Sequence, residues 1–272
     1  MSRKATRLLV TICMLVALIV CVFPFYMMLI MSSYKSEMLF RMMAVLPSDY
    51  LVPNFQTVLK SNFPTSYWNS FYIALLVTML SSLSSAMAGY GFAKYEFKGR
   101  KGLFNVVLAM LMIPSQLGLI AFIWEMRQLG WSDTHLPLIV PAISSSFGVF
   151  WMRQYIRDSV PDEVIDSARI DGANDIRVFF QISLAFIRPA LLSTGLLFFL
   201  WSWNNYMLPL LVITKEDLQT IPLSIAGLRD YHRTDYGAQI LGLSLGTIPM
   251  IALFIVFSKS LISGLAASAV KG

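Results

Sequence analysis

Charged side chains are scarce in this chain. Asp, Glu, Lys and Arg together make up 13% of its 272 residues, whereas hydrophobic residues make up 57%. An ordinary soluble domain carries about 25% charged residues. Such a composition excludes a typical water-soluble domain and indicates a protein whose surroundings are mostly lipid.

Reactive side chains are also few. The two cysteines, Cys13 and Cys21, lie in one apolar run, and the two histidines, His135 and His232, are predicted on the outer face of the membrane. The sequence contains no H-E-x-x-H, G-x-S-x-G or paired-cysteine pattern. We therefore expect no catalytic residue and no metal site, so a membrane enzyme is disfavoured.

Sources of energy for transport are missing as well. There is no G-x-x-x-x-G-K-[ST] loop for ATP, and no carboxylate lies deep in an apolar run. Ion-driven carriers usually keep an ionisable group or an unwound helix at mid-membrane. If this chain pumps a solute, we expect a partner protein to supply the energy.

What the sequence does contain is six long runs without a charged residue, each of at least nineteen residues. They are residues 8–31, 61–93, 102–124, 134–152, 189–214 and 236–258. About 20 residues of helix cross the hydrocarbon layer, and only helices or closed barrels satisfy their backbone in lipid. The runs predict an all-α integral membrane protein with six transmembrane helices.

The distribution of Lys and Arg predicts the orientation. With the N-terminus in the cytoplasm, inner segments carry fourteen of the 21 basic residues and outer loops carry seven. The positive-inside rule therefore predicts that both termini are cytoplasmic. It also accounts for the net charge of +6 without nucleic acid as a partner. The outer stretches 32–60 and 215–235 are predicted to hold a short amphipathic piece and a folded or solvated loop, respectively.

One inner segment concentrates the acidic residues. Six of the fifteen fall within residues 158–175, between two apolar runs. Ser159 and Pro161 predict a helix start, Gly172 a left-handed helix end, and Asn174 the cap of a second helix. The second helix is predicted to present Ile176, Phe179 and Phe180 on one apolar face. Spacing alone leaves two alternatives, a docking element for another protein and an amphipathic hairpin on the membrane surface.

This segment, VPDEVIDSARIDGANDIRVFFQISLAFIRPAL, resembles the EAA loop of permeases in binding-protein-dependent ABC importers. That pattern is E-A-A, three residues, G, then nine residues before I-x-L-P, and the spacing is matched throughout. Asp166, Ser167 and Ala168 stand at the E-A-A positions and Gly172 at the glycine. The departures are Asp for Glu, Ser for the first Ala, and Ala185 for Pro.

The resemblance extends over roughly residues 65–272. WNSFYIALLVTMLSSLSSAMAGYGFAKYEFKGR, MIPSQLGLI, WSWNNYMLPLLV and the ending SKSLISGLAASAVKG are similar to maltose-type permeases, particularly the smaller of their two permease subunits. The resemblance implies the type I ABC importer permease fold in a bacterial cell membrane. It divides the chain into an N-terminal helix and extracytoplasmic segment at 1–64, a transmembrane core at 65–258 and a cytoplasmic tail at 259–272.

The resemblance also implies partners and a mechanism. A second homologous permease, two ATPase subunits and an extracytoplasmic solute-binding protein would complete the transporter, with ATP and Mg used by the ATPase subunits and no cofactor bound here. The substrate would be a carbohydrate, and an oligosaccharide is favoured. A permease for glycerol phosphate, a polyol or another solute remains an alternative, as does a six-span membrane enzyme or scaffold.

Three groups of candidate residues follow. Within the cytoplasmic loop 158–185, the residues expected to form the coupling element for the ATPase are Asp166, Ser167, Ala168, Arg169, Ile170, Asp171 and Gly172. In the tail, Gly264, Leu265, Lys271 and Gly272 are expected to contact the ATPase pair, with extension of the sixth helix as the alternative. Asn204, Asn205 and Tyr206, polar groups inside the fifth run, are expected in helix packing or on the substrate pathway.

Overall fold

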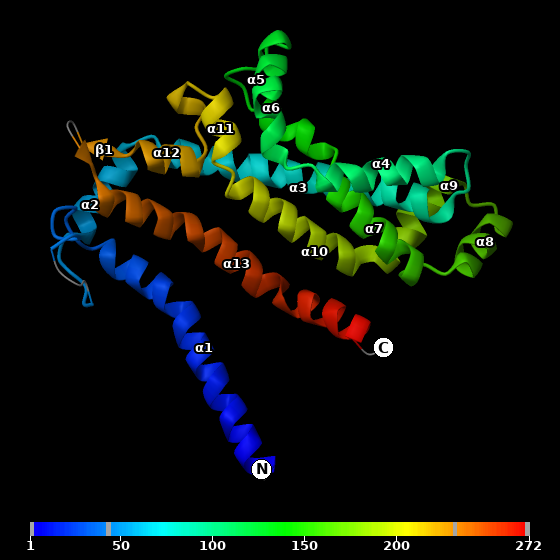
Figure 1. The fold of residues 1–272 in the computed structure, drawn as a ribbon, viewed down its shortest axis with the longest axis horizontal. Coiled ribbons are helices and arrows are strands. Elements are labelled where there is room, and N and C mark those ends of the chain that lie inside the picture. Colours follow the sequence, from blue (N-terminus) through cyan, green and yellow to red (C-terminus); the bar gives the residue numbers. More distant parts are fainter. Residues whose placement is uncertain (1–2, 42–44, 231–232, 270–272) are drawn as a thin grey trace. The chain divides into compact units, whose positions relative to one another are not determined.

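The computed structural model describes residues 3–41, 45–230 and 233–269 (Figure 1). Within them, five helical segments are long and apolar enough to cross a bilayer. These are α1 (Arg3–Met31), α3 (Phe63–Lys94), Leu136–Ser159, Asp175–Trp203 and Tyr236–Phe257, the last being part of α13 (Tyr236–Ala269). A sixth candidate span is the helix pair Arg100–Met112 and Gln116–Gln128, which passes the same test together but bends by 86°. Apart from a hairpin of two-residue strands, the regular structure of these residues is helical, as the sequence predicts.

The described residues form two compact units. The first contains the residues up to Tyr67 together with Ile221–Pro249, and the second contains Trp68–Thr220 together with the chain from Met250 onward. The first unit holds α1, α2 (Leu51–Lys60), α12 (Ile221–Gly227), β1 (Arg229–Asp230), β2 (Arg233–Thr234) and the start of α13. Both outer stretches therefore contain the folded pieces that their sequences allowed.

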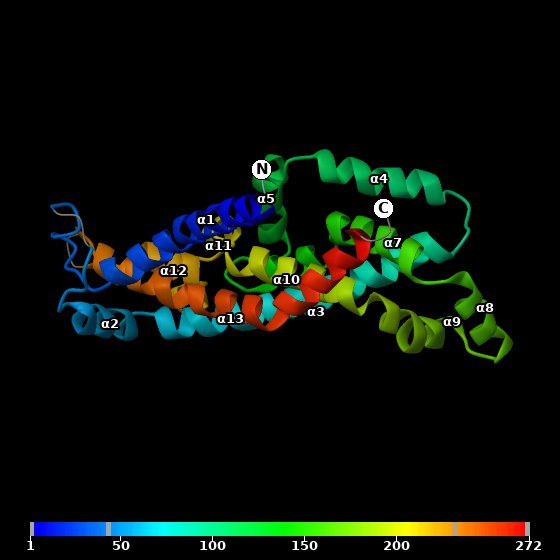
Figure 2. The same cartoon turned by 90° about the horizontal axis from the view of Figure 1, so that it is seen from below.

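The second unit is a helical bundle. In it α7 (Ser146–Ser159) lies between α4 (Arg100–Met112) and α10 (Leu184–Trp203) and contacts both (Figure 2). Its buried core includes Met152, Ile156 and Ile187, none of which has any exposed surface. This core continues directly into the loop after α7, which joins that loop to the transmembrane bundle.

The fourth predicted run, 134–152, is a broken helix. It divides into α6 (Leu136–Ile139), a 3₁₀ turn η2 (Pro141–Ile143) and α7. Pro141 cannot donate a backbone hydrogen bond, so an uninterrupted α-helix would lack one hydrogen bond at this position. Two serines of α3 satisfy carbonyls at the break: Ser81 Oγ donates to the Ala142 oxygen at 2.7 Å and Ser84 Oγ to the Ile143 oxygen at 2.5 Å.

The small residues of α3 serve helix packing. At Gly148 on α7 the two helices approach closely, because a Cβ atom there would lie 2.8 Å from both the Cβ of Ser85 and the ring of Phe198. Ala86 is fully buried in the same core. Short side chains allow α3 and α7 to pack against each other at this point.

The fifth predicted run, 189–214, is wrong in its limits. The long apolar segment is Asp175–Trp203, and residues 204–206 separate it from α11 (Met207–Val212). The prediction treated Arg188 as a boundary, but Arg188 lies inside α10 with an exposed side chain. A long Arg side chain can extend toward the membrane surface, so one arginine does not end a span.

Beyond α11 the chain is held by side chains from two distant segments. Asp133, in the left-handed conformation at φ 54°, accepts hydrogen bonds from the Thr214 amide at 2.5 Å, the Thr214 hydroxyl at 2.7 Å and the Lys215 amide at 3.2 Å. Asn69 of α3 donates to the carbonyls of Asp217 and Gln219. His135 Nε2 lies 2.7 Å from the Leu218 carbonyl, and its Nδ1 contacts the Tyr72 hydroxyl.

The hydrogen bonds that Asp133 accepts also keep it ionised. The Thr214 amide contributes most, and together with the Thr214 hydroxyl and Lys215 it lowers the pKa of Asp133 below its ordinary 3.8. A carboxyl group with a lowered pKa stabilises the fold above its ordinary pKa and loses this contribution only as the pH falls through the lowered value. The Asp133 contact is therefore complete at neutral pH.

We expect Asp133→Ala to release the segment after α11. The variant loses the three acceptor contacts and places alanine in a left-handed conformation, which costs about 1 kcal/mol or more. Amide hydrogen exchange of residues 214–219 in the purified protein should accelerate, while exchange in α7 and α10 stays unchanged. Asp217→Ala is the matched control, because Asp217 is exposed and contributes its carbonyl rather than its carboxylate. Unchanged protection at Thr214 and Lys215 in Asp133→Ala would contradict the assignment.

Candidate functional site

The acidic segment begins with a short helix, α8 (Asp162–Ile170). Asp162 and Glu163 occupy its first turn and Arg169 its last, so all three charges suit the helix dipole. The predicted cap is wrong: Ser159 ends α7, and Pro161 is the residue before α8, with no side-chain hydrogen bond at that end. The helix start thus depends on proline geometry and acidic first-turn residues rather than on a hydroxyl cap.

The end of α8 is confirmed at the predicted glycine. Gly172 has φ +81° and donates to the Arg169 carbonyl at 3.0 Å, while the Ala173 amide donates to the Ala168 carbonyl at 2.9 Å. This pair of bonds is the Schellman motif, in which the residue after the helix cap is left-handed. No atom lies within 4 Å of a Cβ built on Gly172. The requirement for glycine is therefore a backbone requirement and not one of space.

The second helix of the segment begins at the predicted cap but has a different buried face. The Asn174 side chain accepts from the Arg177 amide at 2.8 Å, at the start of α9 (Asp175–Arg177). A π-helical stretch, η3 (Val178–Ser183), follows and leads into α10. Val178 and Phe179 are buried, whereas Ile176 is 71% and Phe180 45% exposed. The predicted face of Ile176, Phe179 and Phe180 is wrong because the turn widens at η3 and the α-helical period does not hold.

The inner face of α8 belongs to the transmembrane core. Ile165 is 3% exposed and Ala168 9%, and both pack in one cluster with Tyr90, Ile156 and Phe179. Ala168, one of the residues expected to form the coupling element, therefore faces its own bundle and not a partner. Its small side chain instead brings α8 close to residues of α3 and α7.

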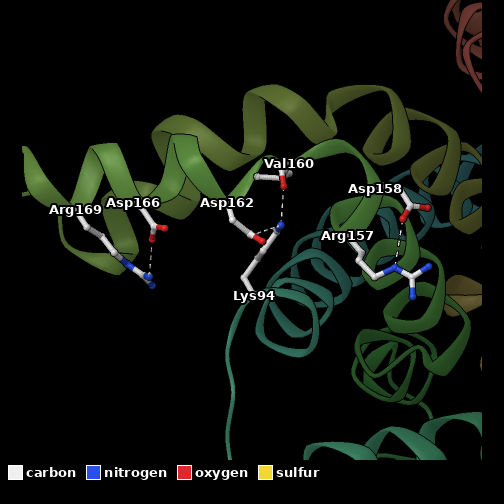
Figure 3. A network of polar contacts seen from close by, with 7 residues as sticks. All are labelled: Lys94, Arg157, Asp158, Val160, Asp162, Asp166 and Arg169. Carbon is white, nitrogen blue, oxygen red and sulfur yellow. Dashed lines mark hydrogen bonds and ion pairs between the residues drawn. The ribbon is translucent and has the colours of Figure 1, made fainter.

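A buried lysine joins the end of α3 to the start of α8 (Figure 3). Lys94 Nζ donates to the Val160 carbonyl at 2.6 Å and pairs with Asp162 Oδ1 at 2.7 Å. The Lys94 side chain is only 6% exposed, whereas that of Asp162 is 77% exposed. A buried ammonium group is costly without such partners, so α3 and the start of α8 are held together.

A second polar contact ties the end of α8 to the next helix. Arg169 lies 3.8 Å from Asp166 on its own helix (Figure 3) and 3.0 Å from Asp175 at the start of α9. The guanidinium also lies 5.9 Å from the centre of the Tyr95 ring. The hydrogen bond with Asp175 is the main cause that raises the pKa of Arg169, so this arginine remains charged.

The outer face of α8 is open to solvent. Of the seven predicted coupling residues, Asp166, Ser167, Arg169, Ile170, Asp171 and Gly172 are exposed, and only Ala168 is buried. Ile170 is 87% exposed, an unusual position for a large apolar side chain beside charged neighbours. Ser167 bonds only within the helix, from its hydroxyl to the Glu163 carbonyl at 2.8 Å. The helix α8 thus exposes acidic side chains and Ile170 to solvent, while Ile165 and Ala168 pack against the bundle.

Sequence reasoning missed Lys94 and Tyr95 as parts of this site. Lys94 contributes to the sequence argument only as one of the basic residues that predict the orientation, and Tyr95 has no part in it. The pattern K-Y at the last turn of α3 carries no signal by itself, because their partners Asp162, Val160 and Arg169 are more than sixty residues away. Only packing of α3 against α8 brings them together.

The predicted pathway residues lie at the break between α10 and α11. Asn204 Nδ2 donates to the Leu200 carbonyl at 2.8 Å and lies 3.3 Å from Met250 Sδ. The Asn205 side chain accepts from the Leu208 amide at 3.2 Å, and Tyr206 is 39% exposed. The two asparagines satisfy the ends of the two helices, which the sequence favoured as a structural role. Contact with a substrate stays a prediction.

The predicted tail contacts divide between described and undescribed residues. Gly264 and Leu265 lie within α13, which continues to Ala269 across the expected boundary at 258/259. The helical extension that the sequence left open is therefore present, while Lys271 and Gly272 lie outside the described residues, as does His232. No group of three or more His, Cys, Asp or Glu side chains suited to a metal ion occurs in the described part of the chain.

Known proteins are similar to this chain in sequence and in fold. Residues 81–268 match the family described as "Binding-protein-dependent transport system inner membrane component". The arabinooligosaccharides transport system permease protein AraQ of Halalkalibacterium halodurans is 34% identical over the full length of both chains. The trehalose/maltose transport system permease protein MalG of Thermococcus litoralis is 31% identical over 98% of this chain and 97% of that protein.

A solved structure supports the fold. It is that of a bacterial ABC transporter involved in the import of the acidic polysaccharide alginate, and one of its chains aligns with a TM-score of 0.80 at 20% identity. The alignment covers 95% of this chain and 98% of the other. The type I ABC importer permease fold expected from the sequence is confirmed, and the alternative of a membrane enzyme or scaffold is excluded by the family. This multi-pass membrane protein therefore belongs to the inner membrane components of binding-protein-dependent transport systems and is a permease subunit.

Proposed function

We propose that this permease carries an oligosaccharide into a bacterial cell as one of two homologous permease subunits, driven by two ATPase subunits that bind α8. The observation that carries the proposal is the form of α8 itself. Its inner face, Ile165 and Ala168, is packed in the transmembrane core, while its tip, Ile170, is 87% exposed. The full-length similarity to permeases named for arabinooligosaccharides and for trehalose and maltose supports the substrate class.

The outer face of α8 suits a protein partner better than lipid. Asp166 and Asp171 are exposed acids, and anionic side chains are unfavourable against an anionic membrane surface. Ile170 is a large exposed apolar group on a segment outside the spans, and a partner's cleft would remove it from water. A cleft with an apolar floor and basic rim has the complementary chemistry. We assign this cleft to the ATPase subunit, which would hold ATP and Mg.

The two bonds of Lys94, to the Val160 carbonyl and to Asp162, form a clamp between α3 and α8. Motion of α8 would pass to α3 through this clamp. A displacement of α8 by the closing ATPase pair acts on Lys94 through Asp162 and Val160, and Lys94 is the last residue of α3. α3 in turn bonds to the break between α6 and α7 through Ser81 and Ser84. Movement of α8 would thus reach a broken helix of the bundle, where a change between outward and inward access is easiest.

The remaining parts of the proposal concern topology and partners. Both termini would be cytoplasmic, on the same side as α8, and the extracytoplasmic solute-binding protein would dock on the opposite side. The break at Asn204, Asn205 and Tyr206 would border the pathway. Gly264, Leu265, Lys271 and Gly272 would contact the ATPase pair, as an extension of α13 rather than as a separate tail.

Uptake by the reconstituted transporter tests the function. The chain is expressed with its companion permease, ATPase and solute-binding protein, and proteoliposomes are supplied with ATP and a panel of labelled solutes. We expect ATP-dependent uptake of a di- or oligosaccharide that the binding protein also binds. Glycerol phosphate, a polyol and an amino acid serve as comparison solutes. Transport of one of these in place of every sugar would overturn the carbohydrate assignment but not the role of α8.

Gly172→Val tests whether the left-handed turn shapes the docking element. Valine at φ +81° is strained by about 1–3 kcal/mol, and nothing nearby needs to be displaced, so the effect should stay local. We expect normal membrane insertion with at least severalfold less co-purified ATPase and a matching loss of uptake. Gly172→Asn is the matched control, because asparagine adopts this conformation far more readily. Full ATPase recovery with Gly172→Val would count against the docking role.

Lys94→Met tests the clamp between α3 and α8. Methionine fills the buried space but removes both bonds, and a hydrogen bond to a charged group contributes roughly 1.5–3 kcal/mol. We expect the number of sugar molecules imported per ATP hydrolysed to fall severalfold while the ATPase still binds. Lys94→Arg should recover part of the ratio, and Lys98→Met, four residues later on an exposed stretch, should leave it unchanged. An unaltered ratio in Lys94→Met would show that the clamp does not transmit motion.

A further inference from the structure

A small positively charged hollow lies between the first turns of α4 and the middle of α7, separate from the α8 surface. It measures about 250 Å³ and is lined by Arg100, Lys101, Phe104 and Asn105 of α4 and by Arg153 of α7. None of these five lining side chains is acidic, and three are cationic. The volume is below the roughly 300–1,000 Å³ of pockets for drug-sized ligands, so the hollow does not suit an oligosaccharide. A compact anion matches both its size and its charge.

Arg153 is the fixed element of the hollow. Its guanidinium carbon lies 3.9 Å from the centre of the Phe104 ring, a cation–π contact that orients the group. One terminal nitrogen donates to the Gln154 side chain at 3.3 Å. The Nε atom is buried and has no hydrogen-bond partner among the described residues. An unsatisfied donor on a charged group is unfavourable, so an acceptor in the hollow would stabilise this arrangement.

The surrounding charge is not neutralised within the described part of the chain. None of the ion pairs there involves Arg100, Lys101 or Arg153. The charges of Arg100 and Arg157 both act repulsively on Arg153. The Arg100 side chain donates to the Tyr95 carbonyl at 2.9 Å. Repulsion among gathered cations makes a bound anion more favourable than it would be at any single residue.

Two further features bear on the charge balance. α4 begins at Arg100 after Gly99, with no side-chain cap, so the positive end of a thirteen-residue helix adds to the potential. Against this, Glu96 lines a neighbouring hollow of about 340 Å³ that shares Arg100 and Lys101. Glu96 offsets part of the charge of those two residues but does not line the hollow that contains Arg153. The net charge of the hollow that contains Arg153 remains positive.

We propose that this hollow binds a phosphate group, and that an anionic phospholipid headgroup supplies it. Phosphate oxygens accept the bidentate hydrogen bonds that arginine offers. The face of α4 beside the hollow presents Leu103 and Val106, each 54% exposed, as a hydrocarbon-facing helix does. Acyl chains could lie along this face while the headgroup enters between the cations. The site lies at the end of the bundle that carries α8 and is independent of the transported solute.

Native mass spectrometry of the assembled transporter in detergent tests the proposal. Phosphatidylglycerol and phosphatidylcholine are titrated separately, and bound lipid is counted for the wild type, Lys101→Gln and Arg153→Gln. Loss of one charge-assisted contact should weaken phosphatidylglycerol binding about tenfold, with little change for phosphatidylcholine. Lys98→Gln is the matched control, since it removes the same charge from the same connection outside the hollow.

The outcomes separate the two sources of phosphate. Displacement of phosphatidylglycerol by millimolar inorganic phosphate would support the phosphate site but overturn the lipid as its occupant, whereas resistance to displacement supports the lipid. Equal weakening by Lys98→Gln and Lys101→Gln, or equal affinity for both lipids, would overturn the site. Lys101→Gln keeps the test decisive even where Arg153→Gln fails to assemble, because the Lys101 side chain makes no hydrogen bond or ion pair within the described residues.

Discussion

The position of α8 depends on a single buried ammonium group. Lys94 is 6% exposed and has its partners on the chain that leads into α8, the Val160 carbonyl and Asp162. Removal of α8 from its place would leave this charge without compensation in a poorly hydrated environment. The apolar contacts of Ile165 and Ala168 with the bundle act in the same direction. The helix α8 is therefore part of the transmembrane core rather than an appendage of it.

A second constraint is the need to satisfy backbone groups wherever a transmembrane helix is interrupted. At the break between α6 and α7, hydroxyl groups of Ser81 and Ser84 bond to the free carbonyls. At the break between α10 and α11, Asn205 accepts from the Leu208 amide. Polar side chains in apolar spans thus first serve the backbone, because an unpaired carbonyl or amide in lipid costs several kcal/mol, on the order of a lost hydrogen bond.

The predicted runs and the observed helices differ where one charge or one proline misled the count. Arg188 was treated as the edge of the fifth span, but its exposed side chain lies within α10. Pro141 interrupts the fourth run, which residue counting treated as one helix. Counting uncharged residues measures length alone. It does not register an arginine whose long side chain reaches the membrane surface, or a proline that lacks a backbone donor. The first allows a span to continue past a charge, and the second breaks a helix.

The sequence by itself determined the class of protein, the number of long apolar segments and the glycine turn after α8, because low charge, run length and a left-handed residue each act locally. Gly172 and Asn174 take the predicted conformations for that reason. Only the tertiary structure decided which side of α8 is buried, that Lys94 holds its start, and that Arg153 lies with Arg100 and Lys101 around one hollow. These features join residues some fifty or more positions apart, and such contacts follow from the packing of α3, α4 and α7 and not from any local pattern.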